Sequence, residues 1–236
     1  MPHDADIASR LQRVRRRIDA AAQRAGRSPA SITLVAVSKT FGPDAVRAAA
    51  SAGQRVFGEN RVQEAVAKID ALGDLDVDWH LIGHLQTNKA RKAASVCAWI
   101  ESVDRLELLH KLEAASAELG IRRSILLQVD LAHEATKHGA AESDLRTLVD
   151  AALAGRALDL RGLMLVPPIP AEAEDSRPWF RQLRDLRDRL VAGGVPADRL
   201  AELSMGMSHD FEVAIEEGAT MVRVGSAIFG TRPLTA

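Results

Sequence analysis

The segment TLVAVSKTFG, residues 33–42, joins an apolar run directly to Ser38 and Lys39. A short run of Val, Leu and Ala that ends at a glycine–proline break is typical of a buried strand. Because side chains alternate between the two faces of a strand, Lys39 is expected on the same side as Val35 and Val37. The segment therefore predicts a buried strand over 33–39 that carries a lysine at its carboxyl end.

Lys39 has two interpretations at this point. Burial disfavours the charged form and lowers the pKa of a lysine, which makes its amine able to attack a carbonyl and form a Schiff base. Alternatively, the long side chain extends from the strand end into solvent. The segment by itself favours neither.

Seven further apolar runs follow, and helix-like segments separate them. The runs are RVFGE (55–59), WHLIG (79–83), AWIESV (98–103), SILLQVDL (124–131), LRGLMLV (160–166), AELSMG (201–206) and MVRVG (221–225). The helix-like segments include PDAVRAAASAG (43–53), RLELLHKLEAASAELG (105–120) and WFRQLRDLRDRLVAGG (179–194). Strands that alternate with helices imply parallel βαβ units.

The number of runs favours an α/β fold of the (β/α)8 TIM-barrel type. Such barrels typically contain about 250 residues, and this chain has 236. A doubly wound sheet is the alternative, but its usual set of about six strands would leave some runs unused. Apolar residues also recur at helical spacing over about 5–25. We therefore predict a single barrel domain over residues 1–236 with an extra N-terminal helix.

Composition excludes several classes of function. The chain carries 31 Lys+Arg against 32 Asp+Glu, so no excess of positive charge favours nucleic acid or an anionic membrane. No apolar run approaches the roughly 20 residues that a membrane helix needs. A single cysteine, Cys97, excludes a disulfide framework and a thiolate metal site. We expect a cytoplasmic protein.

Small and hydroxyl residues follow the last two predicted strands. In MVRVGSAIFG (221–230), Gly225 and Ser226 end a strand and begin a short helix, an arrangement that suits an anion. In LSMGMSHDFEVAIEEGA (203–219), Ser208 or His209 is expected to begin a helix. Barrels often hold phosphate in the loops after strands 7 and 8. The two turns together predict a phosphate cup.

Arg223 and two histidines carry further chemistry. Arg223 lies on the same side of its strand as Gly225, where a guanidinium needs either a carboxylate from another strand or a ligand heteroatom. His80 and His84 have metal-ligand spacing in WHLIGHLQTNK (79–89), but no HExxH motif or cysteine pair supports them. We predict no metal site.

Six motifs, in order, resemble a known family. They are LVAVSKT (34–40), FGENRVQEA (57–65), WHLIGHLQTNK (79–89), RGLMLVPP (161–168), LSMGMSHDFEVAI (203–215) and GATMVRVGSAIFG (218–230). The sequence is similar to the single-domain pyridoxal-phosphate-binding proteins of vitamin B6 homeostasis, the YggS/PROSC type. The resemblance implies a barrel like the N-terminal domain of alanine racemase, with pyridoxal 5'-phosphate at its mouth.

The same resemblance assigns seven positions to the cofactor. They are Lys39, Asn60, Met207, Ser208, Arg223, Gly225 and Ser226. It implies that Lys39 forms the Schiff base, that Arg223 faces the pyridine nitrogen, and that Asn60 lies near both cofactor and lysine. Ser208, Gly225 and Ser226 form the phosphate cup, and the backbone of Met207 lies alongside it. Ser226 is often threonine in relatives, which keeps the hydroxyl. Arg61 stands where relatives commonly have tyrosine.

The residues around this cofactor favour binding over catalysis. An arginine cannot donate a proton to the pyridine nitrogen, so the ring is a poorer electron sink than one paired with a carboxylate. Racemisation of the alanine-racemase type uses a lysine and a tyrosine as bases, and this chain contains no tyrosine. We also expect this chain to lack the second domain of that enzyme. We predict a pyridoxal phosphate homeostasis protein without catalytic residues, a monomer that transiently meets apo-enzymes. A weak racemase or decarboxylase is the alternative, and a Schiff-base aldolase of sugar phosphates is a more distant one.

Overall fold

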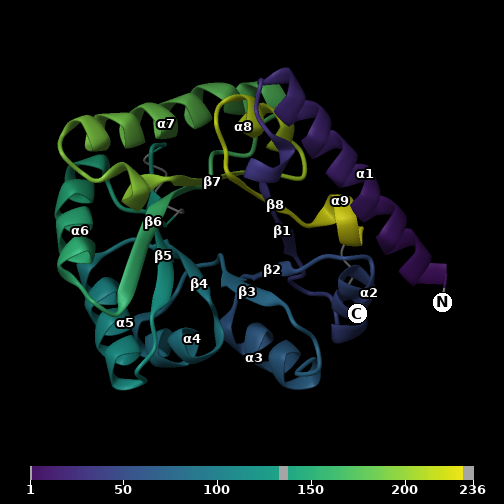
Figure 1. Ribbon diagram of the computed structural model, residues 1–236, viewed down its shortest axis with the longest axis horizontal. Coiled ribbons are helices and arrows are strands. Elements are labelled where there is room, and N and C mark those ends of the chain that lie inside the picture. Colours follow the sequence, from purple (N-terminus) through teal and green to yellow (C-terminus); the bar gives the residue numbers. More distant parts are fainter. Residues whose placement is uncertain (1, 133–137, 231–236) are drawn as a thin grey trace.

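Eight parallel strands form a closed barrel, and helices surround it (Figure 1). The structure is a computed structural model that describes residues 2–132 and 138–230. Each strand pairs with the next in the chain, and the last pairs with the first. The strands are β1 (Thr33–Val37), β2 (Val56–Glu59), β3 (Asp78–Leu81), β4 (Trp99–Val103), β5 (Arg123–Val129), β6 (Leu158–Leu165), β7 (Glu202–Met207) and β8 (Met221–Val224). The predicted TIM barrel is confirmed, with every strand within two residues of its predicted ends.

Helices follow the strands and cover the outside of the barrel (Figure 1). They are α2 (Pro43–Ser51), α3 (Val62–Ala71), α4 (Ala90–Val96), α5 (Leu106–Glu118), α6 (Glu142–Ala154), α7 (Arg177–Ala192), α8 (Phe211–Glu216) and α9 (Ser226–Phe229). Short 3-10 turns lie at Pro29–Ser31, Thr87–Lys89, Ala173–Ser176 and Ala197–Leu200. In the described ranges, no helix combines the length and hydropathy required to span a bilayer.

The extra N-terminal helix α1 (Pro2–Arg24) is also present, within three residues of the predicted start and one of the predicted end. It packs outside the barrel against α2, α8 and α9, so it joins the first and last βα units (Figure 1). Its apolar face is buried from Ile7 to Ala21. Next to this face, Arg17 pairs with Glu212 of α8 at 2.7 Å and lies over the ring of Phe211. The helix thereby supports the part of the barrel that carries β8.

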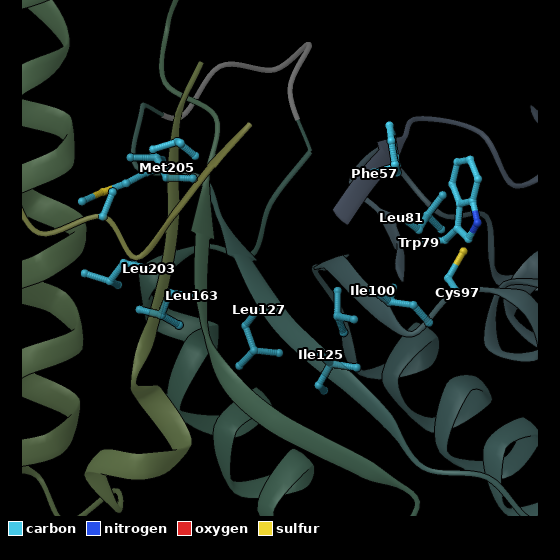
Figure 2. Packing of buried hydrophobic residues seen from close by; sticks show 14 of the residues in the cluster. Phe57, Trp79, Leu81, Cys97, Ile100, Ile125, Leu127, Leu163, Leu203 and Met205 are labelled. Atoms are coloured by element: carbon cyan, nitrogen blue, oxygen red, sulfur yellow. The ribbon is translucent and has the colours of Figure 1, made fainter. Parts of the chain in front are cut away.

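The main hydrophobic core lies between the strands and the surrounding helices. Figure 2 shows apolar side chains from consecutive strands packed in one layer, among them Phe57, Leu81 and Ile100. Cys97 belongs to the same layer, and its burial raises the pKa of the thiol to about 12. Strands β6 and β7 approach closely at Gly162, where a Cβ atom would lie 1.8 Å from the carbonyl oxygen of Glu202. Any larger residue there would separate the two strands.

Candidate functional site

A pocket of about 370 Å³ opens at the carboxyl ends of the strands, where barrel proteins carry their sites. All seven residues predicted from the sequence line it: Lys39, Asn60, Met207, Ser208, Arg223, Gly225 and Ser226. The sequence did not indicate the other lining residues, which are Val37, Phe41, Ile82, Val166, His209 and Gly230. The barrel thus brings together predicted residues that lie up to 187 positions apart in the chain, from position 39 to position 226.

Lys39 enters this pocket from a turn. The prediction of a strand over 33–39 is wrong at its end, because β1 stops at Val37. Thr40 has a φ of 69°, in the left-handed region that non-glycine residues adopt rarely. Its backbone N–H donates to Glu64 Oε2 at 3.2 Å. Alternation along an extended strand therefore does not by itself explain the placement of Lys39, which lies in the turn that follows the strand.

A buried ion pair supports this turn from below. Lys68, on α3, contacts the carboxylate of Glu59 and donates to the Ser38 carbonyl oxygen at 2.7 Å. Ser38 Oγ donates to Glu59 Oε1 at 2.5 Å. Burial raises the pKa of the Glu59 carboxyl, although Lys68 and Ser38 act in the opposite direction. The residue before Lys39 is therefore fixed through both its backbone and its side chain.

Ser208 connects the ends of β7 and β8. Its Oγ accepts the backbone N–H of Gly225 at 3.1 Å and that of Ala227 at 3.3 Å. The expected role of Ser208 or His209 at the start of a helix is wrong, because α8 begins at Phe211 after Asp210. The hydroxyl of Ser208 instead faces the amino end of α9, so the predicted cup residues lie against one another.

Gly225 and Asp210 complete the shape of this cup. A Cβ atom on Gly225 would lie 3.1 Å from the Val37 carbonyl oxygen, so β8 approaches β1 closely there. Asp210 Oδ1 accepts the backbone N–H of Met207 at 2.7 Å, and Ser176 donates to Asp210 Oδ2 at 2.7 Å. The loop after β7 is therefore held from the side opposite to β8.

Arg223 lies inside the barrel, with 3% of its surface exposed. Its Nη1 donates to Ser204 Oγ at 2.7 Å, and its Nη2 donates to the Leu165 carbonyl oxygen at 2.8 Å. Ser204 Oγ in turn donates to Glu101 Oε2 at 2.5 Å. The alternative of a carboxylate from another strand therefore applies, since Arg223 reaches Glu101 through Ser204. The guanidinium also lines the pocket.

Glu101 is the centre of this internal network. His80 Nδ1 lies 2.7 Å from Glu101 Oε1, and the His80 ring stacks on Trp99. Burial raises the pKa of the Glu101 carboxyl, but hydrogen bonds from His80 and Ser204 and the charges of His80 and Arg223 outweigh it, so the pKa lies below its usual value. An ionised Glu101 neutralises the buried charge of Arg223.

We expect Glu101→Gln to destabilise the protein by on the order of 3 kcal/mol at neutral pH, because it removes the main carboxylate that balances the buried charge of Arg223. The lowered pKa of Glu101 means that its ionised form stabilises the fold at neutral pH and that this contribution is lost as the pH falls through that pKa. Urea unfolding at several pH values measures the effect. The difference between wild type and variant should shrink on acidification below roughly pH 4. A difference that is independent of pH would contradict the role assigned to the Glu101 charge.

The two histidines with metal-ligand spacing do not converge. His80 lies inside the barrel against Glu101, whereas His84 lies exposed in the loop after β3. Arg61, the position for which the resemblance implied a tyrosine in relatives, directly precedes α3 and does not line the 370 Å³ pocket. It lines a neighbouring cavity of about 460 Å³ together with His84 and Lys89.

Fold and pocket place this protein in the class of (β/α)8 barrels whose ligand site lies at the carboxyl ends of the strands. The family described as alanine racemase, N-terminal domain, matches residues 9–233. The chain belongs to that family and, within it, to the pyridoxal phosphate homeostasis proteins. One such protein, from Aquifex aeolicus, is 44% identical over 223 residues, which cover 94% of this chain and 97% of that protein. Another, from Pseudomonas aeruginosa, is 45% identical, with 96% of each chain covered.

Solved structures agree with this assignment. PipY of Synechococcus elongatus, solved with pyridoxal phosphate bound, is 42% identical and superimposes with a TM-score of 0.84 over 95% of this chain and 100% of its own. Alanine racemase from Streptomyces coelicolor has a TM-score of 0.69 at 21% identity, with 59% of its chain covered. That second likeness concerns the fold alone.

Proposed function

We propose that this protein binds pyridoxal 5'-phosphate in the 370 Å³ pocket and acts in the homeostasis of that cofactor, rather than as an enzyme. The observation that carries the proposal is the meeting of Lys39, Arg223 and the Ser208–Gly225–Ser226 cup in one pocket. Curated relatives at 44% and 45% identity are named pyridoxal phosphate homeostasis proteins, and the PipY relative has been solved with this compound bound.

The pocket fits the cofactor in its chemistry. When bound, pyridoxal phosphate would supply an aldehyde, which a primary amine can hold covalently with loss of water. Lys39 is the lysine that lines the pocket. Ser208 and Ser226 supply hydroxyl groups for the phosphate. Because Gly225 has no side chain, the phosphate can approach the backbone there. Asn60 lines the same pocket as Lys39, and Met207 lines it beside the cup.

Arg223 limits what this site can catalyse. Its guanidinium remains protonated, so it donates hydrogen bonds toward a ring nitrogen but does not transfer a proton. Ser204 and the Leu165 carbonyl oxygen fix its position. Two-base racemisation also needs a second base, and the chain contains no tyrosine. The site holds a cofactor without the groups that strong carbanion chemistry requires.

His209 favours a weak racemase as the second candidate function, because it is the histidine that lines the pocket. The test is to incubate the protein, loaded with pyridoxal phosphate, with L-alanine in deuterated water and to follow the α-proton by NMR. We expect no deuterium incorporation beyond that of free pyridoxal phosphate. Faster exchange together with formation of D-alanine, both lost in His209→Ala, would establish the racemase and overturn the homeostasis proposal.

The remaining expectations from the sequence belong to the same proposal. We propose one domain over residues 1–236, a monomeric state, and transient transfer of cofactor to apo-enzymes. The buried, unreactive thiol of Cys97 suits the reducing conditions of the cytoplasm. Residues 1, 133–137 and 231–236 of the proposed domain lie outside those that the structure describes.

A further inference from the structure

Three side chains that the proposed function does not use meet at another part of the barrel mouth. They are His84, Asp104 and His138, which follow β3, β4 and β5 respectively. One nitrogen of each histidine and one oxygen of the carboxylate all lie within 4.8 Å of one another. The two imidazole rings stack with centroids 3.6 Å apart. His84 Nδ1 and Asp104 Oδ2 are 3.7 Å apart, which is too long for a hydrogen bond.

The distance between His84 and Asp104 suits a bound ion, whereas the two stacked imidazole rings have to tilt apart for both to bind the same ion. Zinc binds histidine nitrogen and carboxylate oxygen at about 2.0–2.2 Å in a tetrahedral arrangement, which puts two ligand atoms roughly 3.4 Å apart. The 3.7 Å between His84 and Asp104 is close to that value. Two imidazoles and one carboxylate form a donor set that zinc accepts, with one position left for water or another ligand. Both histidines are exposed, so an ion can reach them.

Hydrogen bonds hold the three segments in place. Arg105 donates to the Leu85 carbonyl oxygen at 3.1 Å and to Thr87 Oγ1 at 3.0 Å, which ties the loop after β4 to the loop after β3. Gln128 Nε2 donates to the His138 carbonyl oxygen at 2.6 Å. Arg105 also binds Oδ1 of Asp104, so Oδ2 is the oxygen that faces His84. Supporting contacts of this kind are typical of metal sites.

We propose that His84, Asp104 and His138 bind a divalent metal ion of the zinc class at the barrel mouth, apart from the cofactor pocket. The H-x3-H spacing in the sequence paired His84 with His80, but His80 lies inside the barrel against Glu101. That spacing therefore did not indicate this group of three residues. The ligands instead come from three different βα loops. None of the three lines the 370 Å³ pocket, so the ion is held independently of pyridoxal phosphate.

Calorimetric titration of the full-length protein with Zn2+ tests this proposal, carried out with and without pyridoxal phosphate. We expect one ion per chain in both cases, and visible absorption bands of four-coordinate cobalt when Co2+ replaces Zn2+. His84→Ala and His138→Ala should each weaken Zn2+ binding by more than about 100-fold, beyond the usual cost of a change outside the ligands. His110→Ala, an exposed histidine on α5, is the matched control and should bind Zn2+ like the wild type.

Two results would overturn the metal site. One is that the wild-type protein takes up no Zn2+. The other is that either ligand variant, shown by circular dichroism to be folded, binds Zn2+ as tightly as His110→Ala. In that case the three side chains form only a surface contact between two histidines and a carboxylate. Because neither readout involves the Schiff base, failure here is distinguishable from failure of the proposed function.

Discussion

Replacing Lys39 with alanine is expected to abolish the yellow absorption that appears when pyridoxal phosphate is added to the wild-type protein. The band arises from the Schiff base with a lysine, and Lys39 is the lysine of the pocket that contains Arg223 and the Ser208 cup. Without its amine the pocket can hold the phosphate only through non-covalent contacts. Spectrophotometric titration with pyridoxal phosphate measures the effect, and the expected loss of the band is complete.

Lys89→Ala is the matched control for this experiment. Lys89 lines the neighbouring 460 Å³ cavity rather than the proposed cofactor pocket. Its removal should leave the band and the titration curve unchanged. If Lys39→Ala retained the band while Lys89→Ala lost it, the aldehyde would bind in the neighbouring cavity, and the assignment of the pocket would be wrong.

The second large effect is expected from Lys68→Met. The carboxylate of Glu59 is fully buried and receives its cationic partner from Lys68. Removing one member of a buried ion pair typically costs about 3–5 kcal/mol of unfolding free energy, because the remaining charge stays buried without compensation. The same change removes the hydrogen bond to the Ser38 carbonyl oxygen. We therefore expect a large loss of stability in urea unfolding, and weaker binding of pyridoxal phosphate, since Ser38 precedes Lys39.

The loss of unfolding free energy in Lys68→Met is expected to change with pH in a defined direction. Burial already raises the pKa of Glu59, and loss of Lys68 raises it further. A carboxyl group whose pKa is higher in the folded state favours folding at low pH and loses that contribution as the pH rises. The destabilisation by Lys68→Met should therefore be smaller at about pH 5 than at about pH 8.

Two further variants distinguish the cost of an unpaired buried charge from other effects of replacing Lys68. In Glu59→Gln/Lys68→Met both charges are absent, so part of the lost stability should return. Arg47→Met breaks an exposed pair with Asp74, for which only a small change is expected. A double variant that is no more stable than Lys68→Met alone would show that packing of the lysine side chain, rather than charge, is responsible.

The barrel could be predicted because each of its strands and helices has a recognisable pattern in a short stretch of sequence. Each strand is a short apolar run, and the alternation of eight runs with helical segments leaves few arrangements. Lys39 lines the pocket, as the sequence led us to expect, but strand alternation is only part of the reason. The strand ends at Val37, and Lys39 lies in the turn that follows it, next to Thr40 in the left-handed region.

The polar networks could not be predicted because their partners lie far apart in the sequence. Glu101 binds Ser204, 103 positions away, and the two meet only when β4 and β7 both face the barrel interior. A single carboxylate in AWIESV indicates that a partner is needed but not which one. Glu59 and Lys68 are nearer in sequence, yet their contact depends on how α3 packs beneath the turn after β1. Ser208 was assigned to the cup, but its hydrogen bonds to the turn after β8 were not foreseen.

The most direct test of the central claim is to locate the covalent link on the wild-type chain. The protein is mixed with pyridoxal phosphate, reduced with borohydride, digested, and analysed by peptide mass spectrometry. We predict one phosphopyridoxyl group per chain, on the peptide that contains Lys39. A group found mainly on another lysine, or no stable group at all, would contradict the account of this pocket as a pyridoxal phosphate site.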